Sequence, residues 1–227
     1  MVMVLVVLTF VVFIALDYFV FSRQHAEAAF PAHETRPAVE ALPAVRQAIP
    51  VGISLQPTFT WSRFGPAGEA YVGVHPMLVG LIGEACEFEL LDAGAHVGRG
   101  DPLVRLAQGG HRLTVRSPIG GRVEHVNRQV TGETRWRDLE ENNGGWLYRI
   151  RPETATEESP GWLRGESAAA WTRRQYGLLR DFLHDTLADG HLGFVMADGG
   201  ELPVGILEDM DGSVWAALEE RFLSQVG

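Results

Sequence analysis

The sequence predicts a mainly β protein with one transmembrane helix before its β-domain and a helical extension after it. Three observations carry this prediction: an almost wholly apolar run opens the chain, short alternating segments separated by glycine-rich turns fill its middle, and two amphipathic segments close it. Many short strands at such spacing are typical of a small antiparallel β-sandwich or flattened barrel. At 227 residues the chain has room for one such domain with additions at both ends.

The apolar run VMVLVVLTFVVFIALDYFVFS, residues 2–22, is long enough as a helix to span a bilayer. A secretory signal peptide is the alternative, because AEA at 26–28 resembles a cleavage site, but no basic residue precedes the run. Basic residues flank only its C-terminal side, beginning with Arg23, and predict that side to be cytoplasmic. We therefore expect residues 1–22 to cross the inner (cytoplasmic) membrane once, with the N-terminus outside and the bulk of the chain in the cytoplasm.

Two polar residues, Asp17 and Tyr18, interrupt this helix close to its cytoplasmic end. Asp17 is a candidate contact with a polar group of a neighbouring transmembrane helix, since intramembrane carboxylates usually have partners. The alternative is that Asp17 reaches interfacial water and that Tyr18 lies in the aromatic belt. Residues 23–58 follow with a proline every six or seven residues, which predicts a Pro/Ala-rich and mostly extended tether.

The β-domain is predicted over residues 59–152. Turn sequences such as QGG, SPIGG and NNGG separate alternating segments, so we expect strands at 70–74, 86–91, 101–107, 112–117, 121–127 and 145–152. The segment HPMLVGLIGEA, residues 75–85, predicts one short helix between the first two of these strands.

Residues 61–152 resemble the H protein of the glycine cleavage system, a member of the lipoyl/biotinyl-carrier superfamily. The motifs that carry the resemblance run in order: VGV before a short helix, GEACEFELLDAGAHVGRGDPL, SPIGGRVEHVN, and GWLYRI, which is similar to the family's G-W-L-x-K-I. The resemblance implies a lipoyl-type β-sandwich. It also implies that a hairpin turn, seven residues before the alanine of the family's A-P-x-x-G motif, carries the lysine that is lipoylated.

That position is Gly110 in this chain, counted back from Ser117. All 19 basic residues are arginine, and none of the 227 residues is lysine. Amide attachment of lipoate or biotin requires a primary amine, so we expect no such cofactor and no swinging arm. The Gly109–Gly110 pair still predicts a two-residue hairpin turn.

His111 and Arg112, beside this turn, are candidate partner contacts. A basic hairpin on a chain of net charge −10 could hold an anionic surface of another protein. The alternative is that these are the solvent-facing positions of an alternating strand. The acidic balance of the whole chain argues against a nucleic-acid partner.

No pattern in the sequence supports catalysis or a metal site. The eight histidines show no ligand spacing that would place two of them on one helix face, and nucleotide-binding and hydrolase motifs are absent. The single cysteine, Cys86, lies inside a predicted strand and is expected to be a packed thiol rather than a nucleophile. We therefore expect the protein not to be an enzyme.

Residues 153–227 are predicted to form a linker and a C-terminal helical extension that the usual H protein lacks. Helices are expected at 167–189, where Leu178 belongs to the apolar face, and at 212–225, with Ser167 and Ser213 as N-caps. Large aromatic side chains here are candidate anchors on neighbouring subunits: Trp162, Trp171, Phe182, Trp215 and Phe222. On this interpretation, the β-domain stays folded when residues 161–227 are removed; the alternative is that both helices fold back on the β-domain.

Together these features favour a non-catalytic, membrane-anchored accessory or scaffold subunit of a larger membrane complex. A respiratory or photosynthetic electron transport complex would be a natural host, and the expected partners are its other subunits and the lipid bilayer around residues 2–22. Two alternatives stay open. One is a periplasmic-adaptor-like component of an export system, although such adaptors usually split the domain with a long helical hairpin. The other is a carrier or enzyme with an unrecognised attachment site.

Overall fold

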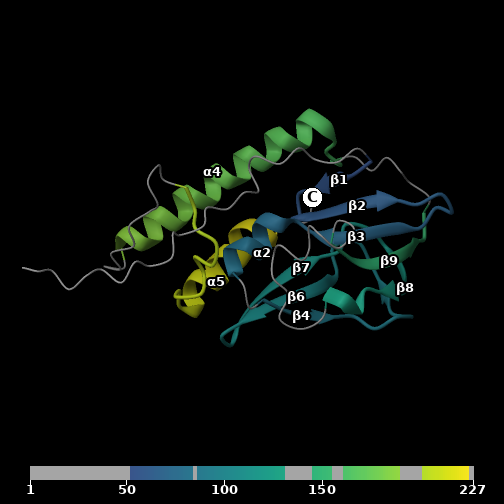
Figure 1. The fold of residues 1–227 in the computed structure, drawn as a ribbon, viewed down its shortest axis with the longest axis horizontal. Coiled ribbons are helices and arrows are strands. Elements are labelled where there is room, and N and C mark those ends of the chain that lie inside the picture. The colour runs from purple at the N-terminus through teal and green to yellow at the C-terminus, as the bar shows by residue number, and fades with distance from the viewer. Residues whose placement is uncertain (1–51, 84–85, 131–144, 155–160, 190–200, 225–227) are drawn as a thin grey trace, which may run out of the picture. The chain divides into compact units, whose positions relative to one another are not determined.

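The computed structural model describes residues 52–83, 86–130, 145–154, 161–189 and 201–224 (Figure 1). The chain divides into two units, residues 1–39 and 40–227, and all of the described ranges belong to the second. The segment expected to cross the membrane, with Asp17 and Tyr18, lies outside the described residues, as does most of the expected tether. No helix within the described ranges combines the length and the apolar character needed to cross a membrane.

The larger of two antiparallel sheets has six strands in the order β1-β2-β3-β9-β8-β5. Alternation along these strands places Val72, Val123 and Ile150 on one face, where they are fully buried. The opposite face carries polar and aromatic side chains. The strands are β1 (Ser54–Gln56), β2 (Thr60–Phe64), β3 (Ala70–Val74), β5 (His96–Val97), β8 (Gly121–Val126) and β9 (Trp146–Pro152).

The smaller sheet has three strands in the order β4-β6-β7: β4 (Glu87–Leu90), β6 (Pro102–Gln108) and β7 (His111–Arg116). Its apolar side chains, among them Leu106, Leu113 and Val115, share one buried core with those of the larger sheet. A single 3₁₀ turn, η2 (Arg128–Val130), follows β8. The prediction of a mainly β fold with antiparallel sheets and C-terminal helices is confirmed, and the direct β6–β7 turn leaves no room for a helical hairpin.

Three strands were not predicted: β1, β2 and β5. β1 lies ahead of residue 59, and its polar residues Ser54 and Gln56 are buried, so apolar alternation did not mark it as a strand. In β2, Trp61 and Ser62 are both buried, and β5 is only two residues long. These strands exist because they pair with neighbours in the sheet, which a local pattern does not report.

Tyr148 joins the two sheets through its hydroxyl group. It lies on β9 of the larger sheet, is fully buried, and donates a hydrogen bond to the Leu103 carbonyl on β6 at 2.9 Å. The same hydroxyl accepts a hydrogen bond from the Leu91 N–H at 2.8 Å. Burial raises the pKa of Tyr148 well above its ordinary value, so the phenol stays protonated and can hold both bonds.

We expect Tyr148→Phe to lower the free energy of unfolding by about 1–3 kcal/mol, because it leaves a partly buried N–H and a buried carbonyl without their partner. Urea unfolding followed by tryptophan fluorescence would measure this loss. Tyr71→Phe, at a partly exposed position of β3, is the matched control and should change stability by less than about 0.5 kcal/mol. Equal effects of the two substitutions would contradict the role given to Tyr148.

The predicted short helix is confirmed as α2 (Pro76–Ile82). His75 is its N-cap, since its Nδ1 accepts a hydrogen bond from the Met77 N–H at 3.2 Å, and Pro76 occupies the first helical position. The last six residues of α2 are all buried, so this helix lies inside the core rather than on it.

The long C-terminal helix α4 (Gly165–Asp189) begins two residues earlier than expected. Ser167 is not its N-cap: the hydroxyl instead bonds back to the backbone N–H and carbonyl of Arg164, at 3.1 and 2.8 Å. The buried stripe runs through Ala168, Leu179 and Leu183, whereas Leu178 falls beyond its edge and is 43% exposed. The expectation that Leu178 shares one apolar face with Trp171 and Leu183 was therefore wrong.

The last helix, α5 (Gly212–Leu218), continues directly into one π-helical stretch, η3 (Glu219–Leu223). Its N-cap is Asp211, whose carboxylate accepts a hydrogen bond from the Ser213 N–H at 2.8 Å, and not Ser213 as expected. Both residue types make good N-caps, and the helix starts early enough to use the aspartate.

Candidate functional site

The candidate site is the tip of the β6–β7 hairpin, where the family resemblance places an attachment residue. Gln108 and His111 pair across the turn, and the two central residues, Gly109 and Gly110, have φ values of 58° and 86°. Two successive positive φ values are the geometry of a type I′ turn, which glycine adopts without strain. The predicted turn is confirmed, and a Cβ built on Gly110 would meet no atom within 4 Å.

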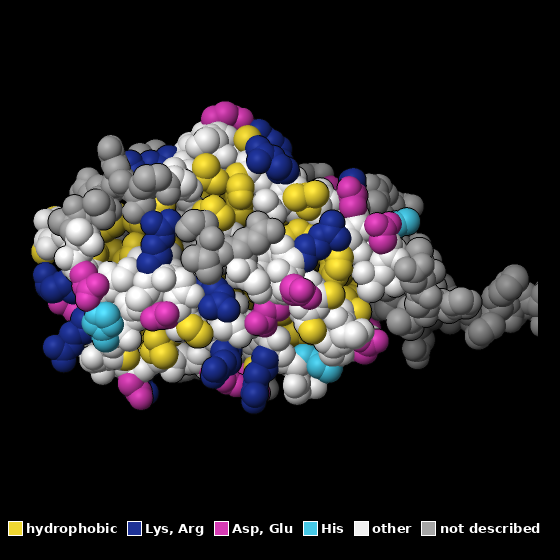
Figure 2. All heavy atoms as spheres, turned by 180° about the vertical axis from the view of Figure 1, so that it is seen from behind, with side chains coloured by type: hydrophobic (Ala, Val, Ile, Leu, Met, Phe, Trp, Pro, Cys, Tyr) yellow, Lys and Arg dark blue, Asp and Glu magenta, His cyan; other side chains and the backbone are white. Residues whose placement is uncertain are grey.

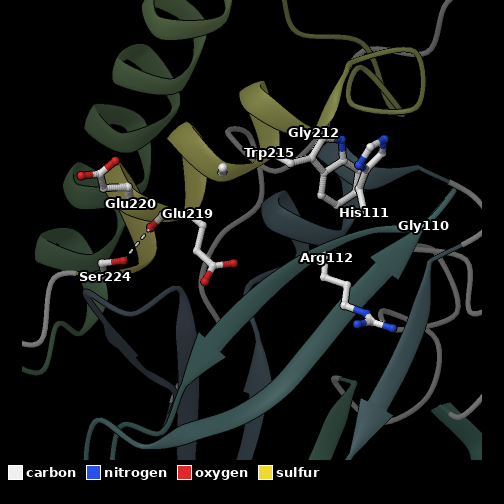
Figure 3. A pocket seen from close by; sticks show the side chains of 9 residues that line it. Gly110, His111, Arg112, Gly212, Trp215, Glu219, Glu220 and Ser224 are labelled. Carbon is white, nitrogen blue, oxygen red and sulfur yellow. Dashed lines mark hydrogen bonds between the residues drawn. The ribbon is translucent and has the colours of Figure 1, made fainter.

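The C-terminal helix α5 lies against this tip (Figure 3). The His111 and Trp215 rings are 5.6 Å apart between centroids and inclined by 31°. Gly212 comes so close that a Cβ on it would lie 3.2 Å from Nδ1 of His111. The Gln108 side-chain amide donates a hydrogen bond to Glu208 at 3.1 Å. The residues beside the turn are therefore held by the C-terminal segment of the same chain.

The edge of the three-stranded sheet is covered in the same way. β7 is an edge strand, and the Thr114 N–H donates a hydrogen bond to the Glu219 carboxylate at 2.9 Å. An uncovered edge strand offers unpaired N–H groups to strands of other molecules. The Glu219 carboxylate accepts the hydrogen bond of the Thr114 N–H, so this N–H is satisfied and is not available to another strand.

An open cleft of about 450 Å³ lies between the hairpin and the helix; it is lined by Gly110, His111, Arg112, Gly212, Trp215, Ala216, Glu219, Glu220 and Ser224. The Arg112 guanidinium turns away from this cleft towards β4, where its Nε lies 3.1 Å from the Glu89 carboxylate (Figure 3). Hydrogen bonds from Ser213 lower the pKa of Asp211, and the nearby His111 contributes in the same direction. No cluster of three or more metal-binding side chains occurs among the described residues, here or elsewhere.

The five aromatic candidates of the C-terminal extension all contact the chain's own core or pack against it. Trp171 packs on Phe59 at 5.1 Å between ring centroids, and Phe182 meets Phe222 edge to face at 5.7 Å. Trp162 stacks on Phe64 at 5.5 Å, and its indole Nε1 is buried without a hydrogen-bond partner among the described residues. Trp171, Trp215 and Phe222 are each less than 10% exposed, so these three are unavailable as anchors on another subunit.

Main-chain hydrogen bonds also tie the extension to the β-domain. Leu163 forms an antiparallel bridge with Leu55 of β1, with N···O distances of 2.8 and 2.9 Å. The N–H groups of Gly205 and Leu207 donate to the carbonyls of Gly80 and Leu81 on α2. The alternative in which both helices fold back on the β-domain is therefore the one the structure contains.

Three residues hold the C-terminal extension against the β-domain, and no pattern in the sequence pointed to this role: His75, Glu208 and Glu219. His75 is buried beside the rings of Phe59 and Trp171, and its Nε2 lies 3.4 Å from the Thr172 hydroxyl on α4. Burial lowers its pKa to about 4. Glu208 and Glu219 look like ordinary exposed acids of a helical tail, since their partners lie about 100 residues away in sequence.

Cys86 is a buried free thiol. Burial, with a smaller contribution from the neighbouring Glu87, raises its pKa to about 12. Because the thiolate is the reactive form, the thiol is inert at neutral pH, as the sequence predicts for a packed cysteine.

The surface of the described residues is predominantly polar. On the face drawn in Figure 2, arginine, acidic and histidine side chains are interspersed, and apolar side chains reach the surface in small areas between them. Leu178 is the large apolar residue that stands most exposed in the described ranges.

Comparison with known proteins gives a consistent result. The family model described as "Glycine cleavage H-protein" matches residues 55–174. The glycine cleavage system H protein of Aeromonas hydrophila is 28% identical over 109 residues, which cover 48% of this chain and 84% of that protein. The H protein of Pseudoalteromonas atlantica is 29% identical over the same length, with the same coverage.

One crystal structure of a glycine cleavage system H protein, from Mycobacterium marinum, aligns with a TM-score of 0.45 and 21% sequence identity, over 55% of this chain and 98% of that one. The family match begins within β1 and ends within α4. It therefore extends beyond residues 61–152 at both ends, and the first part of the C-terminal extension has a counterpart in the family, contrary to expectation.

Proposed function

The chain belongs to the glycine cleavage H-protein family, and we propose that it is a non-lipoylated member that serves as a non-catalytic, membrane-anchored accessory subunit of a larger membrane complex. In this proposal the carrier domain has become a structural module. Its partners are the other subunits of the complex and the lipid bilayer.

The observation that carries the proposal is the identity of residue 110. The attachment position implied by the family motif is occupied by glycine at the tip of a well-formed hairpin, and no lysine occurs in the sequence. A Cβ at this position would have free space around it, so the missing feature is the amine and not the room for it. A swinging lipoyl arm therefore has no anchor at the place where the family carries one.

The packing of α5 supports the same proposal. A carrier hairpin has to present its tip to partner enzymes, whereas here the Trp215 ring lies on His111, and Glu208 and Glu219 hold both strands of the hairpin. Contacts of this kind stabilise a fixed structure rather than a mobile arm.

The membrane part of the proposal rests on the apolar run at residues 2–22, and the basic residues that follow it favour a cytoplasmic location for the remainder of the chain. A respiratory or photosynthetic complex is the kind of host that fits a cytoplasmic-side accessory subunit. Since Trp171, Trp215 and Phe222 are committed to the chain's own core, the contacts with that host have to lie elsewhere on the molecule.

Intact mass spectrometry of the protein isolated from its native host tests the chemical part. We expect the mass of the sequence with no lipoyl or biotinyl adduct, including after growth with added lipoate, because no residue at the hairpin offers a primary amine. The lipoylated H protein of the same cells is the positive control. An adduct on any residue would overturn the proposal.

Extraction in a mild detergent, followed by size-exclusion chromatography and identification of co-eluting proteins, tests the accessory role. We expect a defined set of membrane subunits to co-elute with the full-length chain. The control is a variant in which residues 2–22 are replaced by an unrelated single transmembrane helix, which keeps the membrane location but removes Asp17 and Tyr18. A wild-type chain that elutes alone as a monomer would contradict the accessory role.

A further inference from the structure

The outer face of the six-stranded sheet carries two rows of mostly basic side chains, which strand pairing places side by side. The first row crosses four strands: Arg63 pairs with Tyr71, Tyr71 with Arg149, and Arg149 with His125. The second row pairs Arg151 with Arg122 and Arg122 with His96. We call this surface the arginine face and define it by Arg63, Arg122, Arg149 and Arg151, with Tyr71.

Few acidic groups balance these charges. Glu124, in the bulge of β8, contacts both Arg149 and Arg151, with Nε···Oε distances of 3.5 and 2.5 Å. Glu153, just past β9, contacts His96. Among the described residues, neither Arg63 nor Arg122 has an ion pair with a carboxylate. Counting the described residues, the arginine face is thus locally positive on a chain whose net charge is −10.

One pair of directly opposed like charges indicates that the arginine face is not arranged for stability alone. Arg122 lies directly opposite Arg151. Like charges at directly opposed positions destabilise an antiparallel pair, and any neutral polar residue would fill these exposed positions without that cost. The side chains of Arg149 and Arg151 are 40% and 58% exposed, so their guanidinium groups can reach another molecule.

Aromatic side chains lie among these arginines. Tyr71 meets Trp146 edge to face at 5.5 Å between ring centroids, and the guanidinium carbon of Arg63 lies 5.4 Å from the centre of the Tyr71 ring. Both aromatic residues are partly exposed. Arginine, tyrosine and tryptophan are the residue types that contribute most to protein–protein binding energy.

We propose that the arginine face is a docking surface for an acidic segment of a partner protein. The planar guanidinium group binds carboxylates through two parallel hydrogen bonds, and the Tyr71–Trp146 pair offers an apolar area for the backbone and side chains between the acids. The proposal rests on the proposed function in one respect, because it names the chemistry by which an accessory subunit contacts its complex. It requires no contribution from the C-terminal aromatic residues, which the chain's own core already uses.

Fluorescence anisotropy with the full-length protein in a non-ionic detergent tests this proposal. The probe is a fluorescein-labelled 12-residue peptide of Glu-Glu-Asp-Trp repeats. We expect it to bind, to bind more weakly as the salt concentration rises, and to lose about tenfold in affinity when Arg122→Gln and Arg151→Gln are combined. The matched control is Arg105→Gln with Arg112→Gln, two exposed arginines of the smaller sheet that both contact Glu89, and it should change affinity less than about twofold.

Thermal unfolding of the same variants provides a second measurement. Removing both arginines relieves the Arg122–Arg151 repulsion and also removes the exposed ion pair between Arg151 and Glu124, which contributes at most about 1 kcal/mol. The melting temperature should therefore change little, so that lost binding cannot be ascribed to unfolding. Failure of the wild-type protein to bind the peptide, or equal binding by the Arg122/Arg151 variant, would overturn the proposal. Displacement of the peptide by detergent micelles that contain phosphatidylglycerol, but not by detergent micelles that contain phosphatidylcholine, would overturn it as well, because the face would then be a lipid site.

These results are separable from those that test the proposed function. A lipoyl adduct or a solitary monomer in the extraction experiment would reject the accessory role and leave peptide binding unaffected. Loss of peptide binding alone would reject only the arginine face as the docking surface.

Discussion

A chain that ends at residue 200 should not fold to a stable β-domain. The truncation removes nine buried apolar side chains that belong to the common core: Leu202, Ile206, Leu207, Met210, Val214, Trp215, Leu218, Phe222 and Leu223. At ~2 kcal/mol for each buried side chain, their loss exceeds the ~5–15 kcal/mol by which a domain is usually stable. Removal of all of residues 161–227 should be more damaging still, which reverses the expectation from the sequence that the β-domain folds without them.

Point substitutions in the extension test the same contribution to stability without removing the whole segment. Trp215→Ala should lower the free energy of unfolding by about 3–5 kcal/mol, because the ring is 2% exposed and its N–H donates to the Leu207 carbonyl at 3.1 Å. Glu220→Ala, on the exposed side of η3, is the control and should change it by less than about 0.5 kcal/mol. Urea unfolding followed by circular dichroism measures both. If the chain truncated at residue 200 stays monomeric and keeps its native strand content, the extension is not needed for the β-domain to fold.

Acidification from pH 7.5 to pH 4.5 should destabilise the protein partly through His75. The pKa of this histidine is about 4 in the folded protein, against an ordinary value of 6.5. Above pH 6.5 the ring is neutral in both states and stability does not depend on it. Between 6.5 and 4 the unfolded chain binds a proton that the folded protein does not, so unfolding becomes easier as the pH falls. Below about 4 both states are protonated, and the loss levels off at roughly 3 kcal/mol.

The test compares how the free energy of unfolding changes with pH in wild type and in His75→Asn. Asparagine can keep the N-cap bond to the Met77 N–H but has no proton to gain in this range. We expect the variant to be less stable at pH 7.5 and to lose less stability than wild type on going to pH 4.5. His184→Asn, at an exposed position on α4, should behave as wild type does. If the free energy of unfolding depends on pH equally in wild type and in His75→Asn, the pKa of His75 is not lowered by folding, which would contradict this prediction.

The sequence by itself determined the parts of this protein that depend on short-range patterns. Alternating residues in AYVGV and RLTVRS predicted β3 and β7, because side chains of a strand point to opposite faces in turn. The Gly109–Gly110 pair predicted the hairpin turn, because two positive φ values favour glycine. The absence of lysine followed from the composition alone and needed no structure.

Only the tertiary structure decided what the C-terminal extension covers. Helical spacing showed that Trp171, Trp215 and Phe222 form apolar faces, but burial of apolar surface has no direction, so the same faces could have met another subunit or this chain. The bonds of Glu208 and Glu219 join the tail to a hairpin about 100 residues earlier, and no local pattern encodes such a pair. Strand register likewise placed Arg122 opposite Arg151, since each strand alone shows only exposed arginines and the pairing of β8 with β9 brings their charges together.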